Sequence, residues 1–209
     1  MLLLKDAEFD RLQKQIQPHF LFNTLSTIAG TAYENDDTET AKIVEALGNM
    51  LRYTIHNETK LTCVKQEVKL VEDYMYIQKC RYENRLSFEV DLPTEIMDVE
   101  IPNFTIQPIV ENAIVHVVDV TLEPCKIRLR GRIQESVVEI YVEDSGDCIR
   151  EDILLRQEKE DTGGRRNRVA LKNIDSRIKL LFSEEYGLDI DRINGYSRVT
   201  VKLPNNMRV

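Results

Sequence analysis

Apolar residues recur at intervals of three and four between residues 6 and 30, which predicts an amphipathic helix at the start of the chain. Pro18 lies within this run and predicts a kink, because proline removes a helical hydrogen bond. Gly30 is a plausible end for the helix. Asp36-Asp37 offers the N-cap of a second helix, whose apolar stripe runs from Ile43 to Thr54.

These two helices predict a helical hairpin over roughly residues 1–60. Two helices alone bury little apolar surface, so we expect the hairpin to find a partner. A dimeric four-helix bundle, in which a second copy of the chain supplies the other two helices, is the simplest solution. The polar residues 56–60 are the expected linker to the rest of the chain.

The pattern changes in residues 65–209, where helical and strand-like segments alternate. Residues 66–84, 106–117 and 171–181 have helical spacing, whereas residues 87–92, 126–132 and 137–143 alternate as half-buried strands. The chain closes with a hairpin that turns at Asn194-Gly195. The polar stretch 150–168 is predicted to be a long loop. We therefore expect an α+β sandwich with one mixed sheet and helices on one face.

The composition disfavours several classes of function. The net charge of −8 disfavours nucleic-acid binding, which depends on neutralising phosphates. The four cysteines are far apart, which favours reduced thiols over disulfides or a zinc site. No apolar run approaches the length of a membrane span, and the apolar residues 1–4 are too short for a signal peptide. The chain is consistent with one end of a longer protein.

Three sequence blocks, in the right order and over most of the chain, resemble the LytS-type sensor histidine kinases. Residues 15–25 (QIQPHFLFNTL) resemble the phosphoacceptor box, residues 51–53 and 72–82 the connecting segment, and residues 106–114 (IQPIVENAI) the N-box. The resemblance implies an ATP-binding domain of the GHKL superfamily behind a dimeric phosphotransfer region. It also implies a membrane-anchored parent protein whose kinase end is on the cytoplasmic side of the membrane.

His19 is the phosphate acceptor that the resemblance implies. Phosphorylation needs an accessible, neutral imidazole nitrogen in line with the γ-phosphate of ATP. The next residue, Phe20, has no carboxylate that could act as a base, so a base would come from elsewhere, with Glu111 as a candidate. The alternative for an isolated helical histidine is a structural side chain in a bundle.

The resemblance also implies the nucleotide ligands. Asn112 matches the N-box asparagine that binds the Mg²⁺ of MgATP, and an amide oxygen suits that hard cation. His116, one turn further along, is either a phosphate contact or a surface residue. Asp144 and Gly146 match the adenine site, where the carboxylate accepts a hydrogen bond from the exocyclic amine and the glycine admits the base.

Several positions depart from the family pattern around the nucleotide. Cys148 replaces a second adenine-site glycine, and further departures occupy the N-box and the phosphate loop at Val115, Val117, Arg168 and Ala170. Two hypotheses follow. Either the polar loop, with Gly163, Gly164, Arg165, Arg166 and Arg168, binds the phosphates through charge-assisted hydrogen bonds, or the site has decayed and this stretch is a solvated basic loop.

The predicted function is a two-component kinase core. MgATP would phosphorylate His19, and the phosphate would pass to an aspartate of a response regulator. The alternative is a degenerate kinase that acts as a dimerising scaffold or as a phosphate receiver. A water-hydrolysing ATPase of the same superfamily is disfavoured, because Pro108 occupies the place of its catalytic glutamate. The stimulus, the regulator and phosphorylation within or between subunits stay open.

Overall fold

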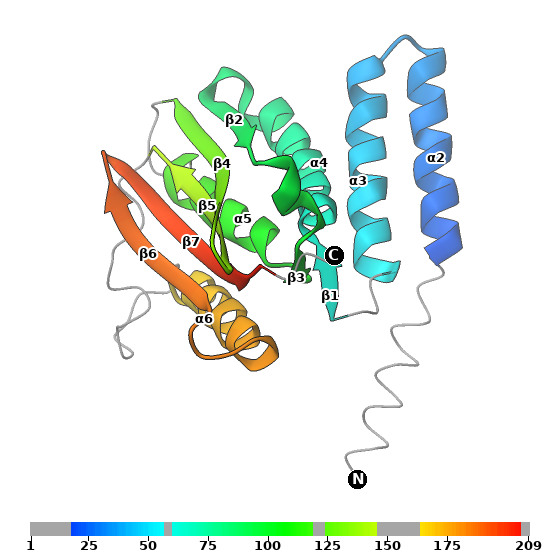
Figure 1. Ribbon diagram of the computed structural model, residues 1–209. Coiled ribbons are helices and arrows are strands. Elements are labelled where there is room, and N and C mark those ends of the chain that lie inside the picture. The colour runs from blue at the N-terminus through cyan, green and yellow to red at the C-terminus, as the bar shows by residue number, and fades with distance from the viewer. Residues whose placement is uncertain (1–17, 57–59, 119–123, 146–163, 206–209) are drawn as a thin grey trace. The chain divides into compact units, whose positions relative to one another are not determined.

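The computed structural model describes residues 18–56, 60–118, 124–145 and 164–205 (Figure 1). The chain divides into two compact units, residues 1–56 and 57–209. The first contains only helices among its described residues, and the second combines helices with a sheet.

In the first unit, α2 (Pro18–Glu34) packs along α3 (Thr38–His56). Oδ1 of Asp37 accepts a hydrogen bond from the backbone N–H of Thr40 at 3.0 Å, which confirms the predicted N-cap. Hydrogen bonds from the side chain of Thr40 and from its backbone N–H lower the pKa of the Asp37 carboxyl. Small residues, Ala29, Ala32, Ala41 and Ala46, are buried in this unit and let the helices approach closely.

The predicted end of the first helix at Gly30 is wrong, because α2 continues to Glu34. A glycine inside a helix costs about 1 kcal/mol relative to alanine, and the packing of Ala29 and Ala32 around it outweighs that cost. Pro18 is the first residue of α2, so the predicted kink involves residues outside the described part of the chain.

The second unit contains one five-stranded mixed sheet, which confirms the predicted α+β class. Its strand order is β2-β4-β5-β7-β6, with β2 and β4 parallel and the other neighbours antiparallel. The strands are β2 (Leu86–Asp91), β4 (Cys125–Gln134), β5 (Val137–Asp144), β6 (Gly187–Ile193) and β7 (Tyr196–Pro204). Both residues of the predicted Asn194-Gly195 turn have positive φ, as a tight hairpin turn requires.

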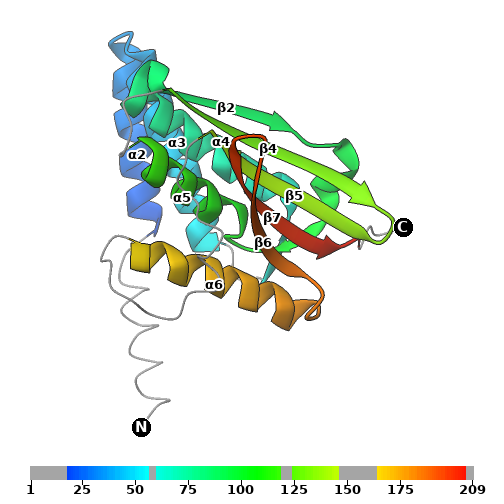
Figure 2. The same cartoon turned by 90° about the vertical axis from the view of Figure 1, so that its left-hand side faces the viewer.

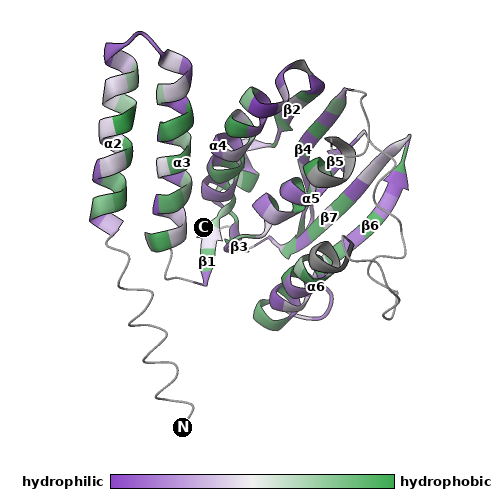
Figure 3. Cartoon of the chain, turned by 180° about the vertical axis from the view of Figure 1, so that it is seen from behind, coloured by the Kyte–Doolittle hydropathy of each residue, from purple (hydrophilic) through white to green (hydrophobic). Residues whose placement is uncertain are grey.

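Three helices cover one face of this sheet (Figure 2). They are α4 (Val64–Tyr82), α5 (Ile106–Val118) and α6 (Gly164–Leu181). Alternate strand residues point toward them and join one buried core with the apolar sides of the helices. The same alternation is visible as bands of hydrophobic and hydrophilic residues along the strands (Figure 3).

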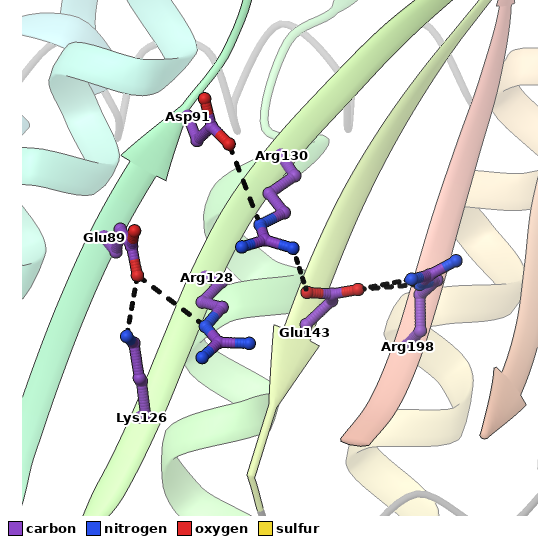
Figure 4. A network of polar contacts seen from close by, with 7 residues as sticks. All are labelled: Glu89, Asp91, Lys126, Arg128, Arg130, Glu143 and Arg198. Atoms are coloured by element: carbon purple, nitrogen blue, oxygen red, sulfur yellow. Dashed lines mark hydrogen bonds and ion pairs between the residues drawn. The ribbon is translucent and has the colours of Figure 1, made fainter. Parts of the chain in front are cut away.

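The opposite face of the sheet carries a network of charged side chains (Figure 4). Alternate residues of β4 are basic, and they meet acidic residues of β2 and β5. The ion pairs join Lys126 and Arg128 to Glu89, Arg130 to Asp91 and Glu143, and Arg198 to Glu143. Since a shift of one residue would reverse every side chain, this network favours the observed register.

Two very short strands escaped sequence prediction. β1 (Leu61–Cys63) pairs antiparallel with β3 (Glu100–Pro102), which follows the short 3₁₀ helix η2 (Thr94–Asp98). A second 3₁₀ helix, η1 (Glu83–Arg85), follows α4. Strands of three residues are too short to display a period of two.

The predicted loop over residues 150–168 is wrong at its C-terminal end. α6 begins at Gly164, so residues 164–168 form the first turns of a helix. The apolar stripe of Leu171, Ile174 and Ile178 is buried against the core and stabilises the helix. Gly164, which the sequence placed within a loop, is therefore the first residue of α6. None of the helices within the described ranges combines the length and apolarity that a bilayer span requires.

Candidate active site

His19 lies in the first turn of α2, and its side chain is exposed. The side-chain amide nitrogen of Asn23, one turn along the helix, lies 3.2 Å from Nδ1 and 3.4 Å from Nε2 of the imidazole. An exposed imidazole in contact with an amide is accessible to a reactant, and the amide influences which ring nitrogen carries the proton.

Helix α5 carries the residues that resemble the N-box. Its apolar side, including Ile109, Val110 and Ala113, is fully buried against β4 and β5. Asn112 is 6% exposed, so its polar side chain lies within the layer between helices and sheet. Glu111 is exposed and accepts a hydrogen bond from Nε2 of Gln107 at 3.3 Å. His116 lies on the same helix, but its side chain is outside the described part.

Asp144 ends β5 and is 1% exposed. It alternates with Ile140 and Val142, so its carboxylate belongs to the helix-covered face of the sheet. Ser145 ties the end of β5 to the start of β4: its N–H donates to the carbonyl of Lys126, whose N–H donates to Oγ of Ser145. Gly146, the other predicted adenine-site residue, lies outside the described residues.

The structure thus brings Asn112 and Asp144 to the same side of the sheet, both buried, and on elements that pack together. The carboxylate is an acceptor for an amine, and the amide oxygen is a ligand for a hard cation. An amine acceptor and an oxygen ligand fit adenine and Mg²⁺, which are the groups that the family resemblance implies for Asp144 and Asn112.

The predicted phosphate-loop residues are only partly described. Gly163 lies outside the described residues, and Gly164 is the first residue of α6. Arg165, Arg166 and Arg168 follow in the first turns of that helix, with side chains outside the described part. Their backbone N–H groups therefore belong to a helix N-terminus, whose dipole favours anions, instead of the loop that the sequence predicted.

Sequence reasoning missed Ser197, which is 1% exposed and directly opposite Asp144 in the pairing of β5 with β7. It shares the helix-covered face with Val199 and Val201. The Asn194-Gly195 turn and the alternation after it could have placed Ser197 on this face, but the pairing of β7 with β5 is not local information.

It also missed Glu67, a fully buried carboxylate on α4. Its oxygens accept hydrogen bonds from the backbone N–H groups of Phe104, Thr105 and Ile106 at the start of α5. The partners are 37 to 39 residues away, so no sequence period could reveal them.

Comparisons with known proteins agree with this architecture. A family model described as histidine kinase matches residues 7–86. The chain is 41% identical over 189 residues to the sensor histidine kinase YesM of Bacillus subtilis (strain 168), covering 90% of this chain and 32% of that protein. It is 34% identical over 206 residues to the sensor histidine kinase YpdA of Escherichia coli (strain K12), which covers 95% of this chain and 34% of YpdA.

The sensor protein LytS of Bacillus subtilis (strain 168) is 29% identical over 210 residues, which cover 97% of this chain and 34% of LytS. The chain therefore spans about a third of the length of these curated relatives. Among solved structures, the catalytic domain of histidine kinase ThkA has a TM-score of 0.52 at 15% identity, covering 69% of this chain and 95% of that domain. Histidine kinase AdeS of Acinetobacter baumannii has a TM-score of 0.51 at 15% identity, covering 93% of this chain and 98% of the AdeS chain.

Over the third of their length that it spans, the chain is similar to sensor histidine kinases, LytS among them, and it has the fold of histidine kinase catalytic domains.

Proposed function

We propose that this chain is the kinase core of a two-component system, which transfers the γ-phosphate of ATP to His19. Residues 1–60 would serve as the dimerisation and phosphotransfer region, and residues 65–209 as the ATP-binding domain. The observation that carries the proposal is the pair of buried polar side chains, Asn112 and Asp144, on the helix-covered face of a histidine-kinase-like fold.

In this proposal MgATP supplies the phosphoryl group, and the chain positions it. The Asp144 carboxylate accepts a hydrogen bond from the exocyclic amine of adenine, which guanine cannot donate from the same place. Gly146 lets the base approach. The amide oxygen of Asn112 would hold Mg²⁺, a hard cation that prefers oxygen ligands and would offset the negative charge of the phosphates.

The start of α6 is the proposed contact for the phosphates. Gly163 and Gly164 let the backbone approach, and the helix N-terminus favours negative charge. Arg165, Arg166, Arg168 and His116 supply further donors. This assignment would explain how the site works without the family's phosphate-loop glycines. Arginine side chains can make the phosphate contacts that a glycine-rich backbone makes in the family pattern.

His19 is the proposed nucleophile. An unprotonated ring nitrogen attacks the γ-phosphorus, a nitrogen–phosphorus bond forms, and the bond from phosphorus to the ADP oxygen breaks. Glu111 is exposed and is the candidate base that removes the remaining imidazole proton. The phosphohistidine would then donate its phosphoryl group to an aspartate of a response regulator.

A homodimer is proposed for the helical unit. Four large apolar side chains remain exposed on α2 and α3, namely Phe20, Ile28, Tyr33 and Leu47. Burying them against the same helices of a second copy would complete a four-helix bundle. Attachment of the whole protein to the cytoplasmic side of the membrane is part of the same proposal, on the strength of the resemblance to LytS-type kinases.

Calorimetric titration with ATP, with and without Mg²⁺, tests the nucleotide site. Saturable binding that needs Mg²⁺ and is lost in Asn112→Ala supports the proposal. Asn49→Ala, at an exposed position on α3, serves as the control and should bind as the unchanged chain does. No binding up to millimolar ATP would support the second candidate, a degenerate kinase that dimerises or receives phosphate on His19.

A further inference from the structure

One buried carboxylate holds the start of α5. Oε1 of Glu67 accepts the N–H of Phe104 at 2.7 Å, and Oε2 accepts those of Thr105 at 3.0 Å and Ile106 at 2.9 Å. The first N–H groups of a helix have no partner within the helix, and the helix dipole favours a negative charge there. Glu67, from a different helix, thus satisfies three donors at once.

The turn that precedes α5 needs this support. Phe104 has a φ of 54°, a left-handed conformation that bulky residues rarely adopt and that persists only where the surroundings hold it. Its carbonyl accepts a hydrogen bond from Nη2 of Arg177 on α6 at 3.0 Å. The hydroxyl of Thr105 donates to the carbonyl of Pro102 at 2.6 Å. α4 and α6 therefore hold one turn from two sides.

The same turn is joined to the beginning of the second unit. β1 pairs with β3, the N–H of Asn103 donates to the carbonyl of Lys60, and the N–H of Val64 donates to the carbonyl of Val99. Glu67 follows four residues after the end of β1. Figure 1 shows β1 and β3 together near α4 and the start of α5. Glu67 therefore lies between the chain that enters this unit and the helix that carries Asn112.

We propose that Glu67 is a positioning residue for the nucleotide site, because its carboxylate determines where α5 begins. Ile106, whose N–H it binds, is less than two helical turns from Asn112. A rigid helix start keeps Glu111 and Asn112 in a fixed orientation toward MgATP. This inference rests on the proposed function for its consequence, but the positioning itself is a property of the unliganded chain.

The test compares Glu67→Gln with Glu72→Gln, a matched substitution at an exposed position on the same helix. The glutamine keeps the size of the side chain, but it loses the charge and turns an amide N–H₂ toward backbone donors. Amide hydrogen exchange without nucleotide is measured for residues 104–112. We expect exchange to rise by about tenfold or more in Glu67→Gln, since charge-assisted hydrogen bonds are lost, while β4 and β5 and the Glu72→Gln chain stay unchanged.

MgATP titration of the same chains gives the second readout. The Kd for MgATP is expected to rise by about tenfold or more in Glu67→Gln at a temperature where the variant is folded. If Glu67→Gln leaves the exchange of residues 104–112 as it is, or raises exchange without raising the Kd, the proposal is overturned. If the chain without substitutions fails to bind MgATP, the proposed function fails, and the exchange result still decides whether Glu67 holds α5.

Glu67→Asp covers the case in which Glu67→Gln does not fold. Aspartate keeps the charge but is one methylene shorter, so it cannot hold all three donors at their present distances. An intermediate rise in both exchange and Kd is expected. Wild-type values for both in a folded Glu67→Asp chain would show that the three hydrogen bonds are not needed, which overturns the proposal.

Discussion

The side-chain amide nitrogen of Asn23 lies 3.2 Å from Nδ1 of His19, one turn away on the exposed surface of α2. An amide can donate through its N–H₂ or accept through its carbonyl. With its N–H₂ toward the ring, Asn23 donates to Nδ1 and favours the tautomer in which Nδ1 has the free electron pair and Nε2 carries the proton. Asn23 is thus placed to orient the ring and to select the nitrogen that reacts.

Asn23→Ala should therefore slow the phosphorylation of His19. The loss of one hydrogen bond of about 1 kcal/mol corresponds to about a fivefold lower rate. The rate is measured at saturating MgATP, with Asn49→Ala as the control. An unchanged rate in Asn23→Ala would show that the amide does not prepare the imidazole.

Asp144→Asn should weaken ATP binding by about tenfold or more, because a neutral amide replaces the buried carboxylate that would accept the adenine amine. The preference for ATP over GTP should also decrease. Competition between the two nucleotides measures both effects. Asp189→Asn changes an exposed carboxylate on β6 and should leave both affinities alone. If Asp144→Asn keeps full affinity and preference, adenine is recognised elsewhere.

The charged network on the open sheet face contains one pair that matters more for stability than the others. Nε and Nη2 of Arg198 lie 2.9 and 2.6 Å from Oε1 of Glu143, whose side chain is 5% exposed. Arg198→Ala should lower the free energy of unfolding by about 3 kcal/mol, because it leaves a buried carboxylate without its main partner. Urea unfolding measures the change.

Lys202→Ala provides the comparison, because Lys202 lies on the same strand as Arg198, β7, but pairs with Asp189 of β6 in a more exposed place. Exposed pairs contribute about 1 kcal/mol or less. Equal losses in Arg198→Ala and Lys202→Ala would contradict the distinction between the buried and the exposed pair.

Tyr141 gives the second unit an alkaline pH dependence. Burial, together with the hydrogen bond that its hydroxyl donates to Glu139, raises its pKa from 10.0 to about 12. A raised pKa in the folded state means that the contribution to stability is complete below pH 10 and is lost as the pH rises toward 12. The difference in unfolding free energy between the unchanged chain and Tyr141→Phe should therefore shrink over that range. A difference that is constant from pH 9 to pH 12 would contradict this assignment.

Local signals in the sequence predicted much of the fold. Asp37 is the N-cap that its position before an apolar stripe suggested, and Asn194-Gly195 turns the last hairpin. These features depend on residues close together in the chain. The same reasoning was wrong at two glycines. The helix α2 continues through Gly30, and α6 begins at Gly164, because tertiary packing stabilises both helices more than glycine destabilises them.

The parts of the site that sequence could not show depend on distant contacts. Asn112 and Asp144 were predicted from a family resemblance, but only the fold shows that both are buried, on a helix and a strand that pack together. Ser197 became apparent only through the pairing of β7 with β5. Glu67 looked like any acidic residue in the first turn of a helix, until its contacts with the start of α5 were known.

The most direct test of the central claim is incubation of the chain with γ-labelled ATP and Mg²⁺, followed by measurement of protein-bound label. The account predicts acid-labile label, as expected for phosphohistidine, which is absent from His19→Gln and strongly reduced in Asn112→Ala. Label of equal amount in His19→Gln would contradict the assignment of His19. No label in the unchanged chain, with Mg²⁺ and ATP in excess, would contradict the kinase itself.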